Sequence, residues 1–168
     1  MKLPYLLAAL TLAFPAWAAE KHVHGAGRID VAIEAGKIEI ELELPLDTLV
    51  GFERAPRNEK ERAALEAAAA TLRDGAGLFL PAAGAACKLT ETTVSMPFAG
   101  ETPAASHGHG HADVDAHYVF ECVNAGTGSL ETALFRKFPR LYRLELQRVG
   151  PEGQAGGRLT PKAPVVRW

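Results

Sequence analysis

The sequence predicts an α+β fold: mostly antiparallel β-sheet with one main helix and a disulfide-tied hairpin. Three observations predict it. Residues 22–44 alternate apolar and polar side chains with the two-residue period of strands. Residues 58–73 repeat their apolar side chains at helical spacing. Two further strand-like segments, 87–96 and 113–123, each contain one of the two cysteines, and the hairpins expected from this order make the sheet antiparallel.

Residues 1–18 have the pattern of a secretory signal peptide. Lys2 provides the positive start, residues 3–14 form an apolar run, Pro15 interrupts it, and Ala16-Trp17-Ala18 fits the cleavage motif. An uncleaved membrane anchor is the alternative, but the run is shorter than the ~20 residues that span a bilayer. We therefore expect export to an oxidising compartment, with no membrane insertion after signal cleavage.

The mature chain, residues 19–168, is expected to form a single domain, because its length is typical of one domain. Without Lys2 it contains 17 basic and 20 acidic residues. No basic patch stands out, so nucleic acid is not an expected partner. Residues 97–112 are rich in Pro, Gly, Ala and His, a composition that predicts a flexible histidine-rich loop.

The first expected element is a β-hairpin within residues 22–44. Its apolar residues occupy odd positions up to Ile33 and even positions from Ile38, which fits a turn at residues 34–37. In that register Ile33 lies beside Ile38. One face is then core, and the other carries polar and charged side chains.

The main helix is expected from Asn58 to about Arg73. Asn58 is a suitable N-cap, Glu59 and Glu61 favour the amino end of the helix dipole, and Gly75 follows the end. Ala64, Leu65, Ala68, Ala69 and Leu72 are its expected apolar stripe. The later elements are expected as a Gly-rich turn at 124–129, a short helix or turn at 132–138, strands at 141–149 and 157–160, and an edge strand at 165–168.

Cys87 and Cys122 are expected to form a disulfide, because two cysteines in an exported chain most often pair. The closed loop of 35 residues corresponds to ~3–4 kcal/mol in the chain-entropy model. A catalytic or metal-binding thiol pair is the alternative, although neither cysteine lies in a Cys-x-x-Cys motif. Pairing of the two strands puts Leu89 beside Phe120, and the disulfide then ties the open end of a hairpin whose tip is the 97–112 loop.

The six histidines indicate a metal-binding function. Alternate residues on a strand point to one face about 6.6–7 Å apart, so two imidazoles can turn toward one ion. Imidazole nitrogen suits Zn²⁺, with Ni²⁺ and Cu²⁺ as alternatives. The histidines form two groups: His22 and His24 near the mature N-terminus, and His107, His109 and His111 in the loop, followed by His117.

His22, His24 and His117 are the best candidates for a fixed site, because all three fall on polar strand faces. If the first hairpin's register continued past Pro45, Asp47 would lie opposite His24. The loop histidines are candidates for a flexible capture segment of modest affinity. The alternative is a structural or protein-interaction module in which the histidines are incidental, on a frayed end and a solvated linker.

The sequence does not favour an enzyme. It lacks the His-Glu-x-x-His, Gly-x-Ser-x-Gly and phosphate-loop motifs. The row Glu39, Glu41 and Glu43 fits a solvated strand face better than paired catalytic carboxylates. A zinc-dependent hydrolase is the less favoured alternative, since three histidines and an open position also describe catalytic zinc.

Several segments resemble the ZrgA-like family of periplasmic zinc-binding proteins, which are linked to zinc limitation. The segments that carry the resemblance are His22-Val23-His24-Gly25, the box from Leu49 to Pro56, the His/Asp-rich insertion leading into His117-Tyr118-Val119-Phe120-Glu121-Cys122, and Leu134 to Pro139. The resemblance implies a periplasmic protein that buffers zinc or delivers it for uptake, with a component of a zinc-uptake transporter as partner.

The chain departs from the family pattern at one position of the Gly-Phe-Glu-x-Ala-Pro box. The family often has histidine at x, whereas this chain has Arg54. Any fixed site must therefore rely on the other histidines. Because imidazoles have an unperturbed pKa of ~6.5, their protonation should release the metal at low pH.

Overall fold

The computed structural model describes residues 23–99, 112–126 and 128–168. The predicted signal peptide and most of the predicted 97–112 loop lie outside these residues. So do four of the candidate ligands: His22, His107, His109 and His111. None of the helices in the described ranges has the length and apolar character needed to cross a bilayer.

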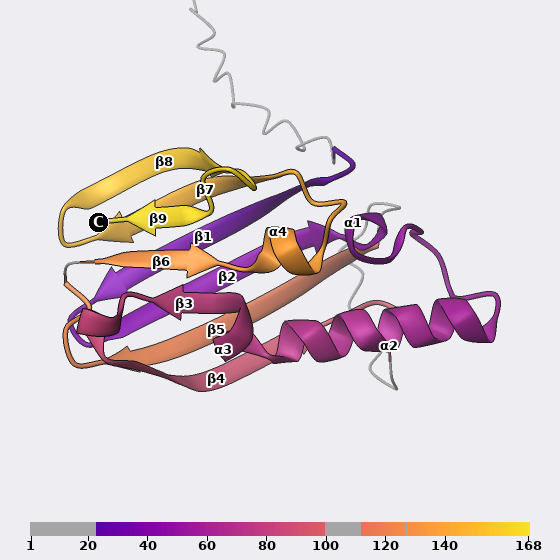
Figure 1. Ribbon diagram of the computed structural model, residues 1–168, viewed down its shortest axis with the longest axis horizontal. Coiled ribbons are helices and arrows are strands. Elements are labelled where there is room, and N and C mark those ends of the chain that lie inside the picture. Colours follow the sequence, from indigo (N-terminus) through magenta and orange to yellow (C-terminus); the bar gives the residue numbers. More distant parts are fainter. Residues whose placement is uncertain (1–22, 100–111, 127) are drawn as a thin grey trace, which may run out of the picture.

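A large sheet of six strands forms one layer of the fold, in the order β4-β5-β2-β1-β7-β8 (Figure 1). All neighbours in it are antiparallel except β1 and β7, which are parallel. The antiparallel sheet expected from the sequence is thus confirmed. The strands are β1 (Ala26–Glu34), β2 (Lys37–Pro45), β4 (Cys87–Ser95), β5 (Asp113–Cys122), β7 (Arg143–Gly150) and β8 (Gly153–Leu159).

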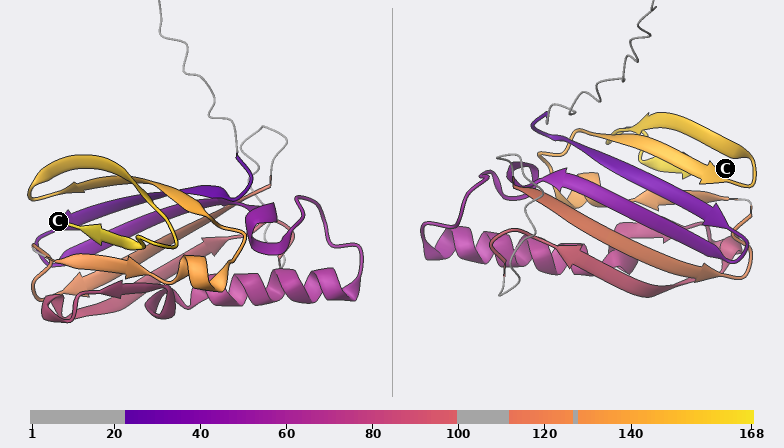
Figure 2. Two further views of the ribbon diagram at one scale, coloured as in Figure 1. Left: turned by 45° about the horizontal axis from the view of Figure 1, so that its top comes forward. Right: turned by 180° about the vertical axis from the view of Figure 1, so that it is seen from behind.

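The second layer combines a small antiparallel sheet, in the order β3-β6-β9, with the helices. It covers one face of the large sheet, and the opposite face is open in the view from behind (Figure 2). Its elements are α1 (Leu46–Val50), α2 (Glu59–Arg73), α3 (Gly75–Leu78), β3 (Phe79–Pro81), a 3₁₀ turn (Ala83–Ala85), β6 (Ser129–Thr132), α4 (Leu134–Lys137) and β9 (Val165–Arg167).

The core lies between these two layers. Alternate residues of β1 and β2 point into it, as the odd and even apolar positions predict, and α2 adds its apolar stripe. Ala64 is exposed, so its assignment to that stripe was wrong. Tyr118 of β5 ties the layers together, because its hydroxyl donates to the carbonyl of Leu72 at 2.8 Å. Buried members of the core include Ile29, Val31, Ile33, Ile38, Ile40, Leu42, Leu65, Ala68, Ala69 and Leu72.

The pairings expected from the sequence are present. Ile33 pairs with Ile38 in the first hairpin, and Leu89 pairs with Phe120 in the second. The α2 cap is also present, since the Asn58 side chain accepts the Glu61 backbone N–H at 2.9 Å.

Cys87 and Cys122 form a disulfide at the open end of the β4–β5 hairpin. The disulfide prediction is thereby confirmed, and it excludes the alternative of a free thiol pair. The described ends of the 97–112 segment lie at the opposite end of the hairpin, beyond Ser95 and before Asp113.

Three elements differ from the sequence prediction. No element was predicted between the first hairpin and Asn58, but the segment after Pro45 contains α1. Ser129 was expected in a turn, yet it begins β6, because Leu130 is buried in the core. Strand β8 begins at Gly153, four residues before its predicted start, because its glycine-rich half gains backbone pairing with β7 rather than side-chain burial.

Candidate metal centre

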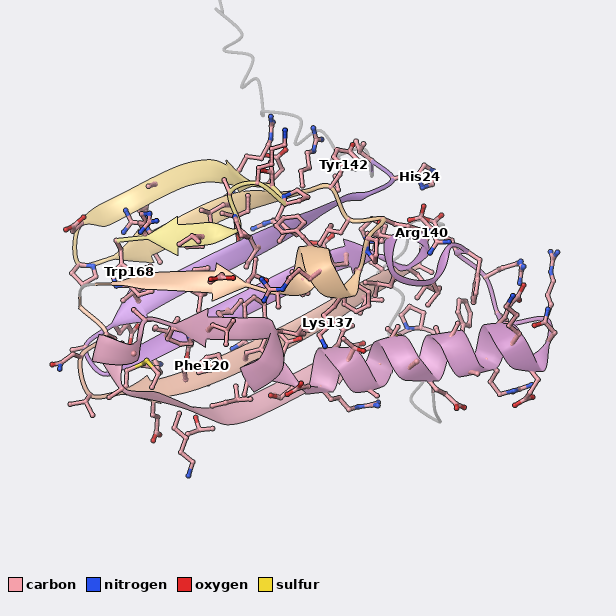
Figure 3. All side chains as sticks on the ribbon, in the orientation of Figure 1. His24, Phe120, Lys137, Arg140, Tyr142 and Trp168 are labelled. Atoms are coloured by element: carbon pink, nitrogen blue, oxygen red, sulfur yellow. A yellow bond between two sulfur atoms is a disulfide. The ribbon has the colours of Figure 1, made fainter. Side chains whose placement is uncertain are left out.

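Three potential ligands converge at the end of the large sheet where β1 begins and β2 ends. His24 lies two residues before the start of β1, Asp47 lies in the first turn of α1, and Glu53 follows α1. Their ligand atoms all lie within 4.8 Å of one another. Figure 3 shows His24 at this outer end of the molecule, on the same side as Tyr142 and Arg140.

The imidazole lies outside the two carboxylates. The His24 side chain is 80% exposed, against 21% for Asp47 and 24% for Glu53. Its Nδ1 atom hydrogen-bonds with Oδ2 of Asp47 and lies 4.0 Å from Oε1 of Glu53. The two carboxylates therefore lie on the more buried side of the group, and the imidazole lies on the solvent side.

Helix α1 positions the two carboxylates by turning the chain sharply after β2. Pro45 precedes its first turn, and Gly51 ends it in the left-handed conformation with a φ of 88°. The Gly51 N–H donates to the carbonyl of Asp47 at 2.7 Å. A Cβ atom at Gly51 would lie 3.1 Å from Nη2 of Arg140, so the left-handed turn and this close packing both favour glycine.

The segment that carries Glu53 is anchored to α2 by the next residue. Arg54 donates to both carboxylate oxygens of Glu61, at 2.7 and 2.9 Å, and its guanidinium lies over the Phe52 ring. Glu61 also accepts the Arg57 backbone N–H at 2.7 Å. The hydrogen bonds from Arg54, then that from Arg57, lower the Glu61 pKa to about 2. Arg54 thus holds the loop that carries Glu53 against α2.

His24 is held in place through its neighbour Gly25, which is buried between two segments. The Gly25 N–H donates to the Thr48 hydroxyl at 3.2 Å, and its carbonyl accepts the Tyr142 N–H at 2.9 Å. Gly25 has a φ of +77°, and a Cβ there would lie 2.6 Å from the Tyr142 ring. A glycine is therefore required at this turn into β1.

His117 lies elsewhere, on the open face of the sheet. It is opposite Glu41 of β2 in the β5 register, and its Nδ1 is 4.0 Å from Oε1 of Glu91. The same row crosses β1 at Asp30, which lies about 13 Å along the strand, at ordinary strand rise, from Ala26 where β1 begins. The structure does not bring His24 and His117 together.

Two described residues that border the undescribed segments lie close to the candidate centre. His22 is two residues from His24 in sequence. At the other segment, the Ala112 carbonyl accepts the Leu46 N–H at 2.8 Å. The chain therefore returns from residues 100–111 at a point one residue from Asp47.

Glu53 was missed as a candidate from the sequence. The signal was present, because Glu53 is the acidic residue of the Gly-Phe-Glu-x-Ala-Pro box. The box was interpreted only as a family feature, since no local spacing relates Glu53 to His24. Asp47, in contrast, was correctly expected beside His24, although it is reached through α1 rather than through a continued strand pairing.

The donor atoms suit zinc. Zinc binds imidazole nitrogen and carboxylate oxygen at about 2.0–2.2 Å, and ligands of a tetrahedral ion then lie about 3.3–3.6 Å apart. The His24 and Glu53 atoms are 4.0 Å apart, and the hydrogen-bonded His24 and Asp47 atoms are closer than this spacing, so the side chains would have to rotate for all three to bind one ion. Three ligands leave one position of a tetrahedral ion open on the exposed side.

One comparison with known proteins gives a match, to a zinc uptake family. No curated protein gives a significant match to the chain. The family described as "ZrgA family zinc uptake protein" matches residues 21–168. That range includes every described strand and helix, together with His24, Asp47 and Glu53. The chain belongs to the ZrgA family of zinc uptake proteins.

Proposed function

We propose that this protein is a periplasmic zinc-binding protein that buffers zinc or delivers it for uptake, with His24, Asp47 and Glu53 as its fixed site. The observation that carries the proposal is the convergence of one imidazole and two carboxylates from three chain segments within 4.8 Å. Membership of a zinc uptake family supports zinc as the ion.

The exposure of His24 suits transfer rather than permanent storage. A structural zinc site is closed by four protein ligands, whereas three ligands leave a position for an exchanging group. His22 and the three histidines of residues 107–111 are proposed as further ligands that pass zinc to this position. Ni²⁺ and Cu²⁺ are expected to compete, because imidazole also binds them.

Export to the periplasm is supported by two features. Residues 1–18 have the composition of a signal peptide, and the Cys87–Cys122 disulfide fits an oxidising compartment. A component of a zinc-uptake transporter is the proposed partner, to which the open coordination position would present the ion.

The proposal is tested by comparing two histidines of the mature chain by equilibrium dialysis against zinc. The starting protein carries His107→Ala, His109→Ala and His111→Ala, so that binding by the loop does not mask the fixed site. In that background His24→Ala should weaken zinc binding about 100-fold, since a ligand is lost. His117→Ala is the matched control and should change the affinity less than about twofold.

Equal affinities of these two variants would contradict the assignment of the fixed site to His24. A second arm measures the starting protein at about pH 7.5 and about pH 5.5, on either side of the unperturbed imidazole pKa. Zinc binding should be weaker at the lower pH, because a protonated imidazole cannot ligate. The same affinity at both values would exclude histidine as the essential ligand.

A further inference from the structure

Thr48 lies directly behind the candidate metal centre. It is 1% exposed and, with Thr132, is one of two buried polar residues in the described ranges. Burying a hydroxyl is unfavourable unless it is hydrogen-bonded. The contacts of Thr48 therefore show what its burial achieves.

The Thr48 hydroxyl joins the two segments that carry the ligands. It accepts the backbone N–H of Gly25, next to His24, at 3.2 Å. It also donates to Oδ1 of Asp47 at 3.4 Å. Both contacts use the hydroxyl in its ordinary roles, one as acceptor and one as donor. The other Asp47 oxygen, Oδ2, is left to face His24.

We infer that Thr48 is a positioning residue of the zinc site, which sets the separation of His24 and Asp47 before the ion binds. This inference rests on the proposed function. Groups that orient a metal ligand typically change metal affinity 10–100-fold when they are lost. The Thr48 contact to Asp47 is long, so the expected loss is at the lower end of that range.

The fold would lose some stability without this hydroxyl, but other contacts also hold the two segments. Gly25 is also held by the Tyr142 backbone and by its own tight packing, and α1 is closed by the Gly51 N–H to Asp47 carbonyl bond. Valine matches threonine in shape, so Thr48→Val keeps the packing and removes only the two hydroxyl contacts. It leaves the buried Gly25 N–H without its acceptor and Asp47 without its donor.

The test measures zinc affinity and thermal stability together, in the background that lacks the three loop histidines. Thr48→Val should raise the zinc Kd about tenfold, and Thr48→Ser, which keeps the hydroxyl, should restore it to within about threefold. Thr132→Val is the matched control. Thr132 is equally buried and its hydroxyl accepts the Leu134 N–H at 3.1 Å, but it lies in β6. Its loss should lower stability and leave the Kd unchanged.

Two results would overturn the inference: equal Kd changes in Thr48→Val and Thr132→Val, or a Thr48→Ser protein as weak as Thr48→Val. If Thr48→Val does not fold, Thr48→Ala in place of it removes the same two contacts and leaves space for water at the Gly25 N–H, and the same comparisons apply. His24→Ala measured in parallel separates the two proposals. A zinc Kd that His24→Ala does not change would refute the proposed site itself. A zinc Kd that changes with His24→Ala but not with Thr48→Val would refute only the positioning role.

Discussion

His24 and His117 both lie near carboxylates, but in settings that differ in geometry. His24 is at a strand end, where β1, α1 and the following loop bring three side chains to one point. His117 stands within β5, on a pleated face where adjacent side chains project side by side, with Cβ atoms about 4.5–5.5 Å apart. Ligands converge where the chain changes direction, and a flat strand surface keeps them apart.

Charged groups on the open face of the large sheet are also engaged with one another. Lys37 donates to Glu39 at 2.7 Å, and Arg158 donates to Glu145 at 3.2 Å across β7 and β8. The Lys37 hydrogen bond is the main cause of the lowered pKa of Glu39. Exposed pairs of this kind contribute only about 0–1 kcal/mol each. The acidic row on β2 is thus a solvated face, as its alternation predicts.

The largest expected effect is on the free energy of unfolding, and it should come from removing the disulfide near His117 while the His24 region is left unchanged. Replacing both Cys87 and Cys122 by serine removes the constraint on a 35-residue loop, and we expect the free energy of unfolding to fall by about 3–4 kcal/mol. Urea denaturation measures this loss. The disulfide ties β4 to β5, which carry Glu91 and His117, and not the β1–α1 end that carries His24.

Zinc affinity of the folded double variant should therefore stay within about twofold of the parent protein. A large fall in affinity under conditions where the protein is folded would show that the site depends on the β4–β5 hairpin. That outcome would favour His117 over His24.

A smaller effect on zinc affinity is expected when the carboxylates beside the two histidines are replaced in turn. Glu53→Gln should raise the zinc Kd about tenfold, because a neutral amide oxygen is a poorer zinc ligand than a carboxylate. Glu91→Gln makes the same chemical change 4.0 Å from His117 and should leave the Kd unchanged. Competition with a zinc-binding dye, in the background without the loop histidines, measures both. Equal effects would remove the distinction between the two regions.

The smallest effect concerns the anchor of the Glu53 loop. Glu61→Gln weakens the two hydrogen bonds from Arg54, so Glu53 becomes less well positioned and the zinc Kd should rise about two- to threefold. Glu59→Gln is the control, because Glu59 pairs with Arg62 on the exposed surface of the same helix. Glu59→Gln should leave the zinc Kd unchanged. An equal rise in Kd for both variants would mean that the charge of the helix, and not the Arg54–Glu61 pair, influences zinc binding.

The same pair predicts a pH dependence of stability. The Glu61 pKa is lowered from 4.5 to about 2 in the folded protein, so its stabilisation is complete above the unfolded value and is lost as the pH falls through the folded one. The stability difference between the parent and Glu61→Gln should be constant near neutral pH and shrink between pH 4.5 and about 2. Denaturation series across that range measure it, and a difference that persists at the lowest pH would contradict the pairing.

Local patterns were sufficient for the elements that depend on neighbouring residues. The change from odd to even positions between Ile33 and Ile38 determined the first hairpin register, because one face of each strand is buried. Asn58 and the acidic first turn located the start of α2. In both cases the signal and the structure it specifies lie within a few residues.

Features that depend on distant segments could not be predicted in this way. The parallel pairing of β1 with β7 joins segments more than a hundred residues apart, and no local pattern encodes it. Without the order of strands, the separation of His24 from His117 was also unknown. Glu53 reaches His24 only because Gly51 adopts a left-handed turn, a change of direction that apolar periodicity does not record.

The hydrogen bond from Leu46 to Ala112 has a consequence for how zinc would move. It places Ala112 beside α1, and His111 precedes Ala112 in the sequence, so their Cα atoms are about 3.8 Å apart. Ligands tethered this closely act at an effective concentration in the millimolar range or above. If the loop histidines bind zinc as proposed, exchange of an ion between them and His24 would be an intramolecular step, whose rate would not depend on how dilute the protein or the metal is.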